Sequence, residues 1–146
     1  MESPDLDGVM AIEESSFLTP WSRGMFAEDL GRDFSAPVVA VGEGGEIVGY
    51  AVCWTAAGES HLLNIAVHPA RRRRGIGRAL VRECIARGAR AGSSLLHLEV
   101  RVGNEEAQRL YGSMGFRFLG IRKRYYTDTG EDAVLLAREI RESDAH

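Results

Sequence analysis

The sequence contains few cysteines and prolines and no long hydrophobic run. Its 146 residues include 2 cysteines and 4 prolines, and Cys53 and Cys84 lie far apart in the sequence without a CxxC pair. This pattern supports neither a disulfide framework nor a cysteine-based zinc site, so both cysteines are expected to be small apolar core residues. No apolar run approaches the roughly 18 residues that a membrane-spanning helix needs, so no membrane partner is expected.

The start of the chain also lacks the features of a secretory signal. The segment MESPDLDGVM is acidic from its second residue and has no basic stretch followed by an apolar one. We therefore expect a cytoplasmic protein. The 45% hydrophobic and 27% charged residues are close to globular averages, which excludes the disordered and fibrous classes. At roughly 150 residues per domain, and without a repeat or linker, we expect one domain that spans residues 1–146.

Hydrophobic periodicity and capping residues predict alternating helices and strands. Helices are expected at Leu6–Phe17, from a Ser22 cap to about Arg32, from Gly75 to about Arg90, and from an Asn104 cap to Met114. Strands are expected at Val38–Val41, Ile47–Trp54, Leu62–Val67, Leu95–Val100, about Arg117–Tyr126, and Ala133–Glu139. This order predicts an α/β (α+β) fold in which helices flank a mixed sheet.

Arginines gather in the middle of the chain, although the formal net charge is -3. Arg71–Arg74 are consecutive, and Arg78 follows them. Gly75 and Gly77 stand among these arginines at the start of a predicted helix, after a strand and a short loop. Helix N-termini expose unpaired N–H groups, and glycines let a phosphate come close to them. The segment therefore suits a ligand with several phosphates, including a pyrophosphate.

Two other interpretations of this segment are weaker. Gly75-x-Gly77 followed by the acid Glu99 imitates a dinucleotide-binding fingerprint, but Leu80 occupies the third glycine position and the preceding loop is long. A nucleic-acid contact would require aromatic side chains among the arginines and a basic chain, whereas the sequence pI is about 5.8. No direct nucleic-acid partner is therefore expected.

One segment resembles the acetyl-CoA-binding motif of GNAT-type N-acetyltransferases; it reads LLNIAVHPARRRRGIGRALV. Arg72, Gly75 and Gly77 meet the family pattern Q/R-x-x-G-x-G/A. Further segments are similar to the RimI family within this group: TPWS at Thr19–Ser22, LHLEVRVGNEEAQRLYGSMGF at Leu96–Phe116, and RKRYYTDTGEDAVLL at Arg122–Leu136. The resemblance covers nearly the whole chain.

The resemblance implies a single N-acetyltransferase domain with a mostly antiparallel sheet. The family has a strand before its first helix, whereas this chain begins almost at the helix, at Pro4 and Asp5, so that strand is expected to be shortened or absent. The resemblance also implies acetyl-CoA as co-substrate, no metal, and a protein N-terminus as acceptor, the N-terminal alanine of a small-subunit ribosomal protein. Because the CoA motif says nothing of the acceptor, a lysine side chain or a small-molecule amine stays open. A non-catalytic CoA- or RNA-binding module is the alternative of another class.

The resemblance also assigns site residues, position by position. The cofactor-binding residues would be Ile65, Ala66, Val67, Arg72, Arg73, Arg74, Gly75, Ile76, Gly77, Arg78 and Asn104. Glu99 resembles the family's general base, and Tyr111 matches its general acid, which protonates the departing CoA thiolate. Trp21, Tyr125 and Tyr126 are expected around the acceptor cleft.

Without the resemblance, the same residues have simpler interpretations. A carboxylate on the polar face of a strand, such as Glu99, is usually only solvated. Tyr111 lies on an apolar helix stripe and fits a plain core aromatic, and an N-cap role explains Asn104 equally well. The histidines show no pairing or metal-ligand spacing, although His97 shares a strand face with Glu99; they are His61, His68, His97 and His146.

Overall fold

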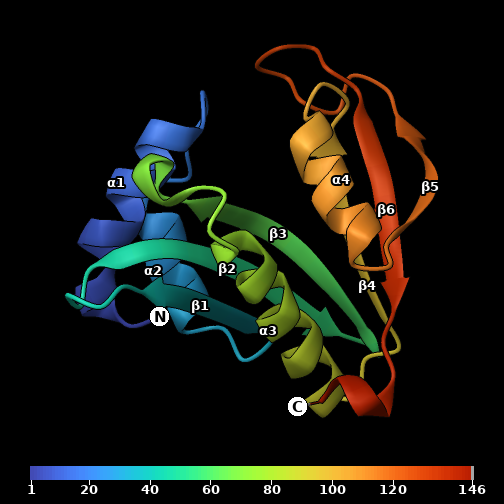
Figure 1. The fold of residues 1–146 in the computed structure, drawn as a ribbon, viewed down its shortest axis with the longest axis horizontal. Helices are drawn as coiled ribbons and strands as arrows, with labels where there is room; N and C mark the ends of the chain where they lie inside the picture. Colours follow the sequence, from blue (N-terminus) through green and yellow to red (C-terminus); the bar gives the residue numbers. More distant parts are fainter. Residues whose placement is uncertain (146) are drawn as a thin grey trace.

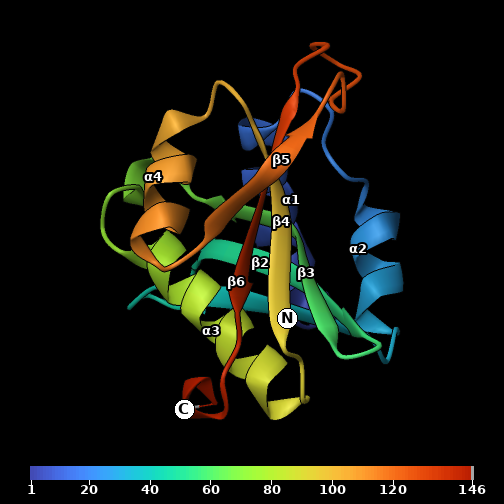
Figure 2. The same cartoon turned by 90° about the vertical axis from the view of Figure 1, so that its right-hand side faces the viewer.

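A computed structural model describes residues 1–145 as one six-stranded sheet with helices on both faces (Figures 1 and 2). The helices are α1 Leu6–Ser16, α2 Arg23–Leu30, α3 Ile76–Arg90 and α4 Glu105–Ser113. The strands are β1 Ser35–Val41, β2 Ile47–Ala56, β3 Glu59–Val67, β4 Leu95–Arg101, β5 Arg117–Arg122 and β6 Ala133–Glu139. Among residues 1–145, no helix is both long and apolar enough to cross a membrane. The predicted mixed α/β class is confirmed.

Short polar side chains begin two of the helices. Ser22 Oγ accepts a hydrogen bond from the Met25 N–H at 3.2 Å, and Asn104 Oδ1 accepts one from the Ala107 N–H at 3.1 Å. Both predicted caps are therefore confirmed. Gly75 precedes α3 with a φ of 81°, in the left-handed region that favours glycine. The turn into α3 thus requires a glycine at this position, whatever ligand it meets.

The sheet order is β1-β2-β3-β4-β6-β5, and neighbouring strands are antiparallel except for β3 and β4. This parallel pair is short, because its register runs only from Glu59 opposite Leu95 to Leu62 opposite Leu98. Beyond that point β3 stays paired with β2, and β4 stays paired with β6. The two strands therefore diverge and open the sheet at one end (Figure 1). The mostly antiparallel sheet implied by the resemblance is confirmed.

Two apolar clusters hold the helices to opposite faces of the sheet. Side chains alternate along β2, so Tyr50 and Val52 pack on the face that α1 and α2 cover, while Ala51 and Cys53 pack on the face that α3 covers. Figure 2 shows the two helix pairs on either side of the strands. Cys53 and Cys84 are both buried in the second cluster, as expected from the sequence.

Two expectations concern the ends of elements. β5 ends at Arg122, so the predicted extension to Tyr126 is wrong. The chain turns there, because Arg124 has a φ of 51° and its N–H donates to Asp132 Oδ1 at 2.9 Å.

Within residues 1–145, no strand precedes α1, and the chain enters that helix through a short 3-10 helix at Ser3–Asp5. The described residues therefore contain no counterpart of the family's first strand, as expected.

Gly88 of α3 lies in a tight contact with β3. A Cβ added there would meet Ser60 Oγ at 2.9 Å and Ile140 Cδ1 at 3.0 Å. Ser60 has little room to move, since it is fully buried and its hydroxyl is hydrogen-bonded to the hydroxyls of Thr55 and Ser93 at 2.9 and 2.8 Å. The helix therefore approaches the sheet as closely as it does only because this position carries no side chain.

We expect Gly88→Ala to lower the free energy of unfolding by about 1–3 kcal/mol, because overpacking at this contact outweighs the better helix propensity of alanine. The matched control is Gly112→Ala in α4, where an added Cβ would meet no atom within 4 Å. That change should be neutral or should stabilise the protein by up to about 1 kcal/mol. Urea unfolding measures both free energies. Equal stabilisation by the two substitutions would contradict the tight contact between α3 and β3.

Candidate active site

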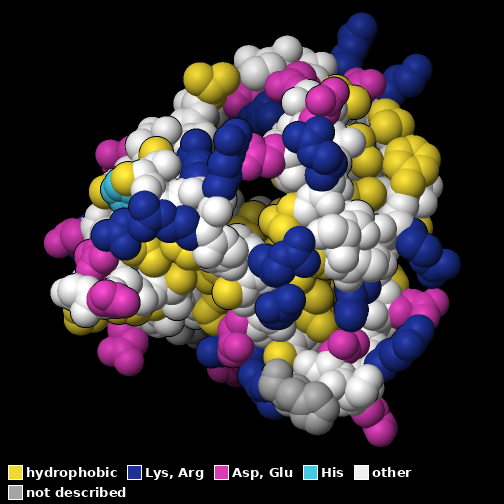
Figure 3. Space-filling view, in the orientation of Figure 1, with side chains coloured by type: hydrophobic (Ala, Val, Ile, Leu, Met, Phe, Trp, Pro, Cys, Tyr) yellow, Lys and Arg dark blue, Asp and Glu magenta, His cyan; other side chains and the backbone are white. Residues whose placement is uncertain are grey.

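A cleft of about 710 Å³ opens where β3 and β4 diverge. Its walls are the end of β3, the end of β4, the loop before α3 with the first turn of that helix, and one side of α4. Figure 3 shows this face as a hollow with basic side chains around it. The cleft therefore joins the arginine and glycine segment to the strand that carries Glu99.

Most of the predicted site residues line this cleft. They are Ile65, Ala66, Val67, Arg72, Arg73, Gly75, Ile76, Gly77, Arg78, Glu99, Asn104, Tyr111 and Tyr126. The lining does not include Arg74, Trp21 or Tyr125. Arg74 is exposed in the loop before α3, and the ring of Trp21 packs on Phe26 with centroids 5.1 Å apart. Tyr125 is exposed and packs edge-on against Tyr126.

One end of the cleft combines positive charge with free N–H groups. The first turn of α3 presents the unpaired N–H groups of a helix N-terminus, and the helix dipole adds partial positive charge there. Two arginines are held in place at this end: Arg72 Nε donates to the Val67 carbonyl at 3.3 Å, and Arg78 donates to Ser113 Oγ at 2.7 Å. An anion at this end would meet guanidinium groups and the helix N-terminus together.

The end of β3 presents backbone groups to the cleft. The His68 N–H donates to the Val48 carbonyl of β2 at 2.8 Å. Because N–H groups alternate along a strand, those of Val67 and Ile65 point away from β2, toward the side from which β4 has diverged. An extended ligand with amide groups can pair with them as an added strand would.

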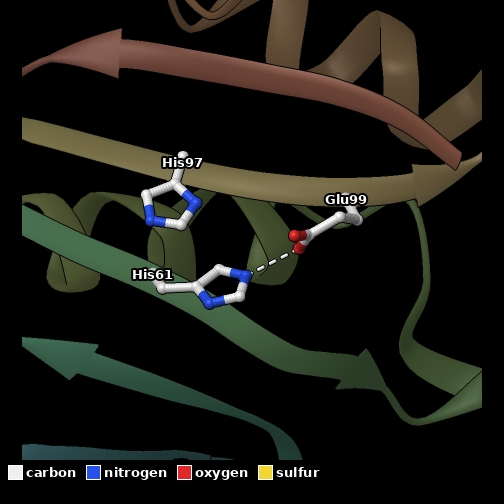
Figure 4. A group of neighbouring side chains, drawn as sticks. All are labelled: His61, His97 and Glu99. Carbon is white, nitrogen blue, oxygen red and sulfur yellow. Dashed lines mark hydrogen bonds and ion pairs between the residues drawn. The ribbon is translucent and has the colours of Figure 1, made fainter. Parts of the chain in front are cut away.

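Glu99 lies on β4 at the inner part of the cleft, and its side chain is 13% exposed. Its carboxylate pairs with His61 Nε2 at 2.6 Å (Figure 4). Burial opposes ionisation of Glu99, but the hydrogen bond from His61 and the nearby positive groups outweigh it. The pKa of this carboxyl therefore lies below its usual range. Glu99 is thus ionised at neutral pH and accepts the hydrogen bond that His61 donates.

The absence of pairing expected among the histidines is wrong for two of them. His61 of β3 and His97 of β4 are directly opposite in the parallel register, and their rings stack with centroids 4.3 Å apart. Burial, followed by the charge of His61, lowers the pKa of His97. Sequence spacing could not reveal this pair, because α3 separates the two strands and no local turn sets their register.

Tyr111 belongs both to the core and to the cleft. Its ring is buried and packs against Phe116 with centroids 5.5 Å apart, while the residue lines the cleft. Burial raises the pKa of its phenol, so the hydroxyl stays protonated. Tyr126 lines the cleft as well, and Arg101 lies over its ring at 4.1 Å. Burial raises the pKa of Tyr126 to about 12.

Sequence reasoning missed a buried carboxylate next to the cleft, that of Glu13 in α1. Its side chain is 1% exposed and accepts hydrogen bonds from the Trp21 N–H at 2.8 Å, from Asn64 Nδ2 at 2.8 Å, and from the Tyr50 hydroxyl. These bonds tie the segment between α1 and α2 to β2 and β3, and Asn64 itself lines the cleft. The sequence offered one signal, since Glu13 falls four residues after Val9 on the apolar face of the helix.

The chain is similar in sequence to known N-acetyltransferases. The profile of the acetyltransferase (GNAT) family matches residues 6–116. A ribosomal protein bS18-alanine N-acetyltransferase of Escherichia coli is 36% identical over 142 residues, which cover 96% of this chain and 95% of the relative.

Two solved structures are similar over nearly the whole chain. The crystal structure of the ribosomal-protein-S18-alanine N-acetyltransferase from Escherichia coli matches with a TM-score of 0.87 at 35% identity and covers 96% of this chain and 90% of that one. The structure of Ard1 from Thermoplasma volcanium matches with a TM-score of 0.89 at 25% identity and covers 97% of this chain and 95% of that one.

We expect Glu13→Gln to lower the free energy of unfolding by about 1–3 kcal/mol, because the amide replaces one acceptor oxygen by a donor and leaves a buried partner unpaired. The matched control is Glu14→Gln, an exposed neighbour on the same helix, which should change stability by less than about 0.5 kcal/mol. Thermal and urea unfolding compare the two variants. If both unfold like the unsubstituted protein, the carboxylate does not hold the α1–α2 segment.

Proposed function

The chain belongs to the acetyltransferase (GNAT) family, and from this premise we propose that it transfers the acetyl group of acetyl-CoA to the N-terminal alanine of ribosomal protein bS18. The observation that carries the proposal is that one cleft is lined both by the arginine-rich N-terminus of α3 and by the enclosed carboxylate of Glu99. Relatives that match nearly the whole chain are named for this acceptor. A ribosomal protein as acceptor puts the reaction in the cytoplasm.

The residues of the cleft fit acetyl-CoA. At Gly75 an added Cβ would meet nothing within 4 Å, so the space beside the N-terminus of α3 is free for a diphosphate. Arg72, Arg73 and Arg78 neutralise its charge, and the N–H groups of Ile65 and Val67 bind the amides of the pantetheine arm. The bound molecule supplies the thioester acyl group and a thiolate as leaving group. No metal takes part in this scheme.

Glu99 accepts the proton of the acceptor amine, directly or through a water molecule. A weak base is sufficient for an N-terminal amine, since an α-amine with a pKa near 7.8 is roughly 30% neutral at about pH 7.4. A lysine side chain with a pKa near 10.4 is only about 0.1% neutral at the same pH. The ionised carboxylate of Glu99, with its low pKa, therefore suits an α-amine better than a lysine.

Tyr111 donates its hydroxyl proton to the departing sulfur. Its raised pKa keeps that proton available, and the packed ring fixes where the hydroxyl lies. Within residues 1–145, Tyr111 donates no hydrogen bond to another protein group, so its proton is not already committed. The transfer is direct. Cys53 and Cys84 are buried outside the cleft lining, so neither serves as a nucleophile.

The acceptor is the part of the proposal to test first. We expect free CoA to be released from acetyl-CoA in the presence of peptides that begin Ala-Arg. The control peptides have a blocked N-terminus and a free lysine, and these should release little CoA. Release with the lysine peptides alone would overturn the α-amine acceptor. If neither peptide reacts but acetyl-CoA raises the melting temperature, the cofactor assignment stands, and small amines and a required partner protein are the next candidates to test.

We expect Glu99→Gln to lower kcat by about 10²–10⁴-fold, because the amide cannot take up the amine's proton. The matched control is Glu139→Gln, at the far end of β6, where the side chain is exposed and pairs with Arg117. Acetyl-CoA should still raise the melting temperature of both variants. A Glu99→Gln protein with full activity would exclude the base role and would favour a different proton acceptor. If the unsubstituted protein binds CoA but transfers no acetyl group to any amine, the chain is a binding module.

A further inference from the structure

Two histidines converge on the carboxylate of Glu99, which lines the cleft. His61 and His97 occupy opposite positions on β3 and β4, and Glu99 lies two residues after His97 on the same face of β4. One ligand atom from each of the three side chains lies within 4.8 Å of the others. Figure 4 shows the three side chains directed toward one another from the adjacent strands. Within residues 1–145, no other group of His, Cys, Asp or Glu side chains meets this condition.

This donor set is the kind that transition metals select. Imidazole nitrogens with a carboxylate oxygen bind Zn²⁺ at about 2.0–2.2 Å, and two histidines with one glutamate leave a coordination position open for water. Ligand atoms of a tetrahedral zinc site lie about 3.3 Å apart, as follows from these bond lengths. The three ligand atoms therefore need to move only slightly closer together, and side-chain rotations can supply this change. The backbone already fixes the three Cβ atoms on one face.

Two rearrangements must accompany metal binding. The rings of His61 and His97 are nearly parallel, 18° apart, so an ion cannot lie in both ring planes until one ring turns about its side-chain torsions. Both side chains are only partly buried, which leaves room for this rotation. His61 Nε2 also carries the proton that it donates to Glu99. If Nε2 ligates the ion, that proton must leave it, and Nδ1 carries the ring proton of the ligating imidazole.

We propose that His61, His97 and Glu99 form a binding site for a divalent transition-metal ion, Zn²⁺ in particular, and that the bound ion inhibits the acetyltransferase. Metal binding follows from the cluster itself. Inhibition rests on the proposed function, because a carboxylate that ligates Zn²⁺ is not free to take up the proton of the acceptor amine. The ion would bind reversibly, since the hydrogen bond between His61 and Glu99 competes with it for both side chains.

The experiment titrates the whole protein with Co²⁺ as a spectroscopic substitute for Zn²⁺. We expect one equivalent to give the visible absorption of a nitrogen- and oxygen-ligated site, and Zn²⁺ to displace it. His97→Gln removes one ligand. It should weaken binding by at least about tenfold, because even the loss of a group that only supports a ligand has an effect of this size. The matched control is His68→Gln. His68 lies outside the cluster, where its Nδ1 accepts from the Ala70 N–H, so Co²⁺ binding should persist.

A measurement without substitution guards against a variant that does not fold. Zn²⁺ added to the unsubstituted protein should shift the ring signals of His61 and His97 in a nitrogen-correlated NMR spectrum and leave those of His68 unchanged. Absence of a stoichiometric Co²⁺ spectrum, or equal binding by His97→Gln and His68→Gln, would overturn the metal site.

The inhibitory half has its own readout. Zn²⁺ should inhibit acetyl transfer by the unsubstituted protein, and His97→Gln should require at least tenfold more Zn²⁺ for the same fractional inhibition, each variant being compared with its own metal-free rate. Stoichiometric binding without inhibition would overturn the inhibitory role and would count against Glu99 as the base. If the protein acetylates no amine, the Co²⁺ spectrum still decides the metal site, so the two failures remain distinguishable.

Discussion

The early separation of β3 from β4 is the constraint on which the site depends. Each strand keeps a full partner on its other side, β2 or β6, so neither needs the other beyond Leu62 and Leu98. Their inner edges are thereby left to line the cleft. The crossover through α3 begins where β3 ends, which brings a helix N-terminus to the same open end of the sheet. The arginine-rich N-terminus of α3, the free edge of β3 and the Glu99 carboxylate thus line one cleft because of a single break in the ladder.

A second constraint holds the opposite wall. The buried carboxylate of Glu13 is acceptable energetically because three donors satisfy it, and these donors come from the α1–α2 segment, β2 and β3. On the far side, Arg101 pairs with Asp128 at 2.8 Å and covers the ring of Tyr126. Thr19 Oγ1 donates to Asp128 Oδ2 at 3.4 Å, which links the segment between α1 and α2 to the segment between β5 and β6. Both sides of the cleft are therefore held by polar contacts between segments that are distant in the sequence.

The sequence is sufficient to predict features that depend on residues close together in the chain. Ser22 and Asn104 begin helices because their side chains accept from nearby N–H groups, and the glycines and arginines before α3 indicate an anion site for reasons contained in a single turn. The position of His61 opposite His97 is different, because a parallel register is fixed by how α3 packs and not by any turn between the strands. The burial of Glu13 likewise depends on Tyr50 and Asn64, which no local pattern connects to it. Only the tertiary structure shows that Trp21 packs against Phe26 and does not line the cleft.

The strand order at the β5 edge of the sheet bears on the order in which the sheet can form. Residues up to α3 include β1, β2 and β3, which pair as sequential hairpins and can form while synthesis continues. β4 can then pair with β3 only over their short register. β5 cannot join the sheet before β6, because β6 lies between β5 and β4. Ala133–Glu139 is therefore the segment that completes the sheet. Because β6 pairs with β4 along its whole length, the strand that carries Glu99 is held on both sides only once this segment has joined the sheet.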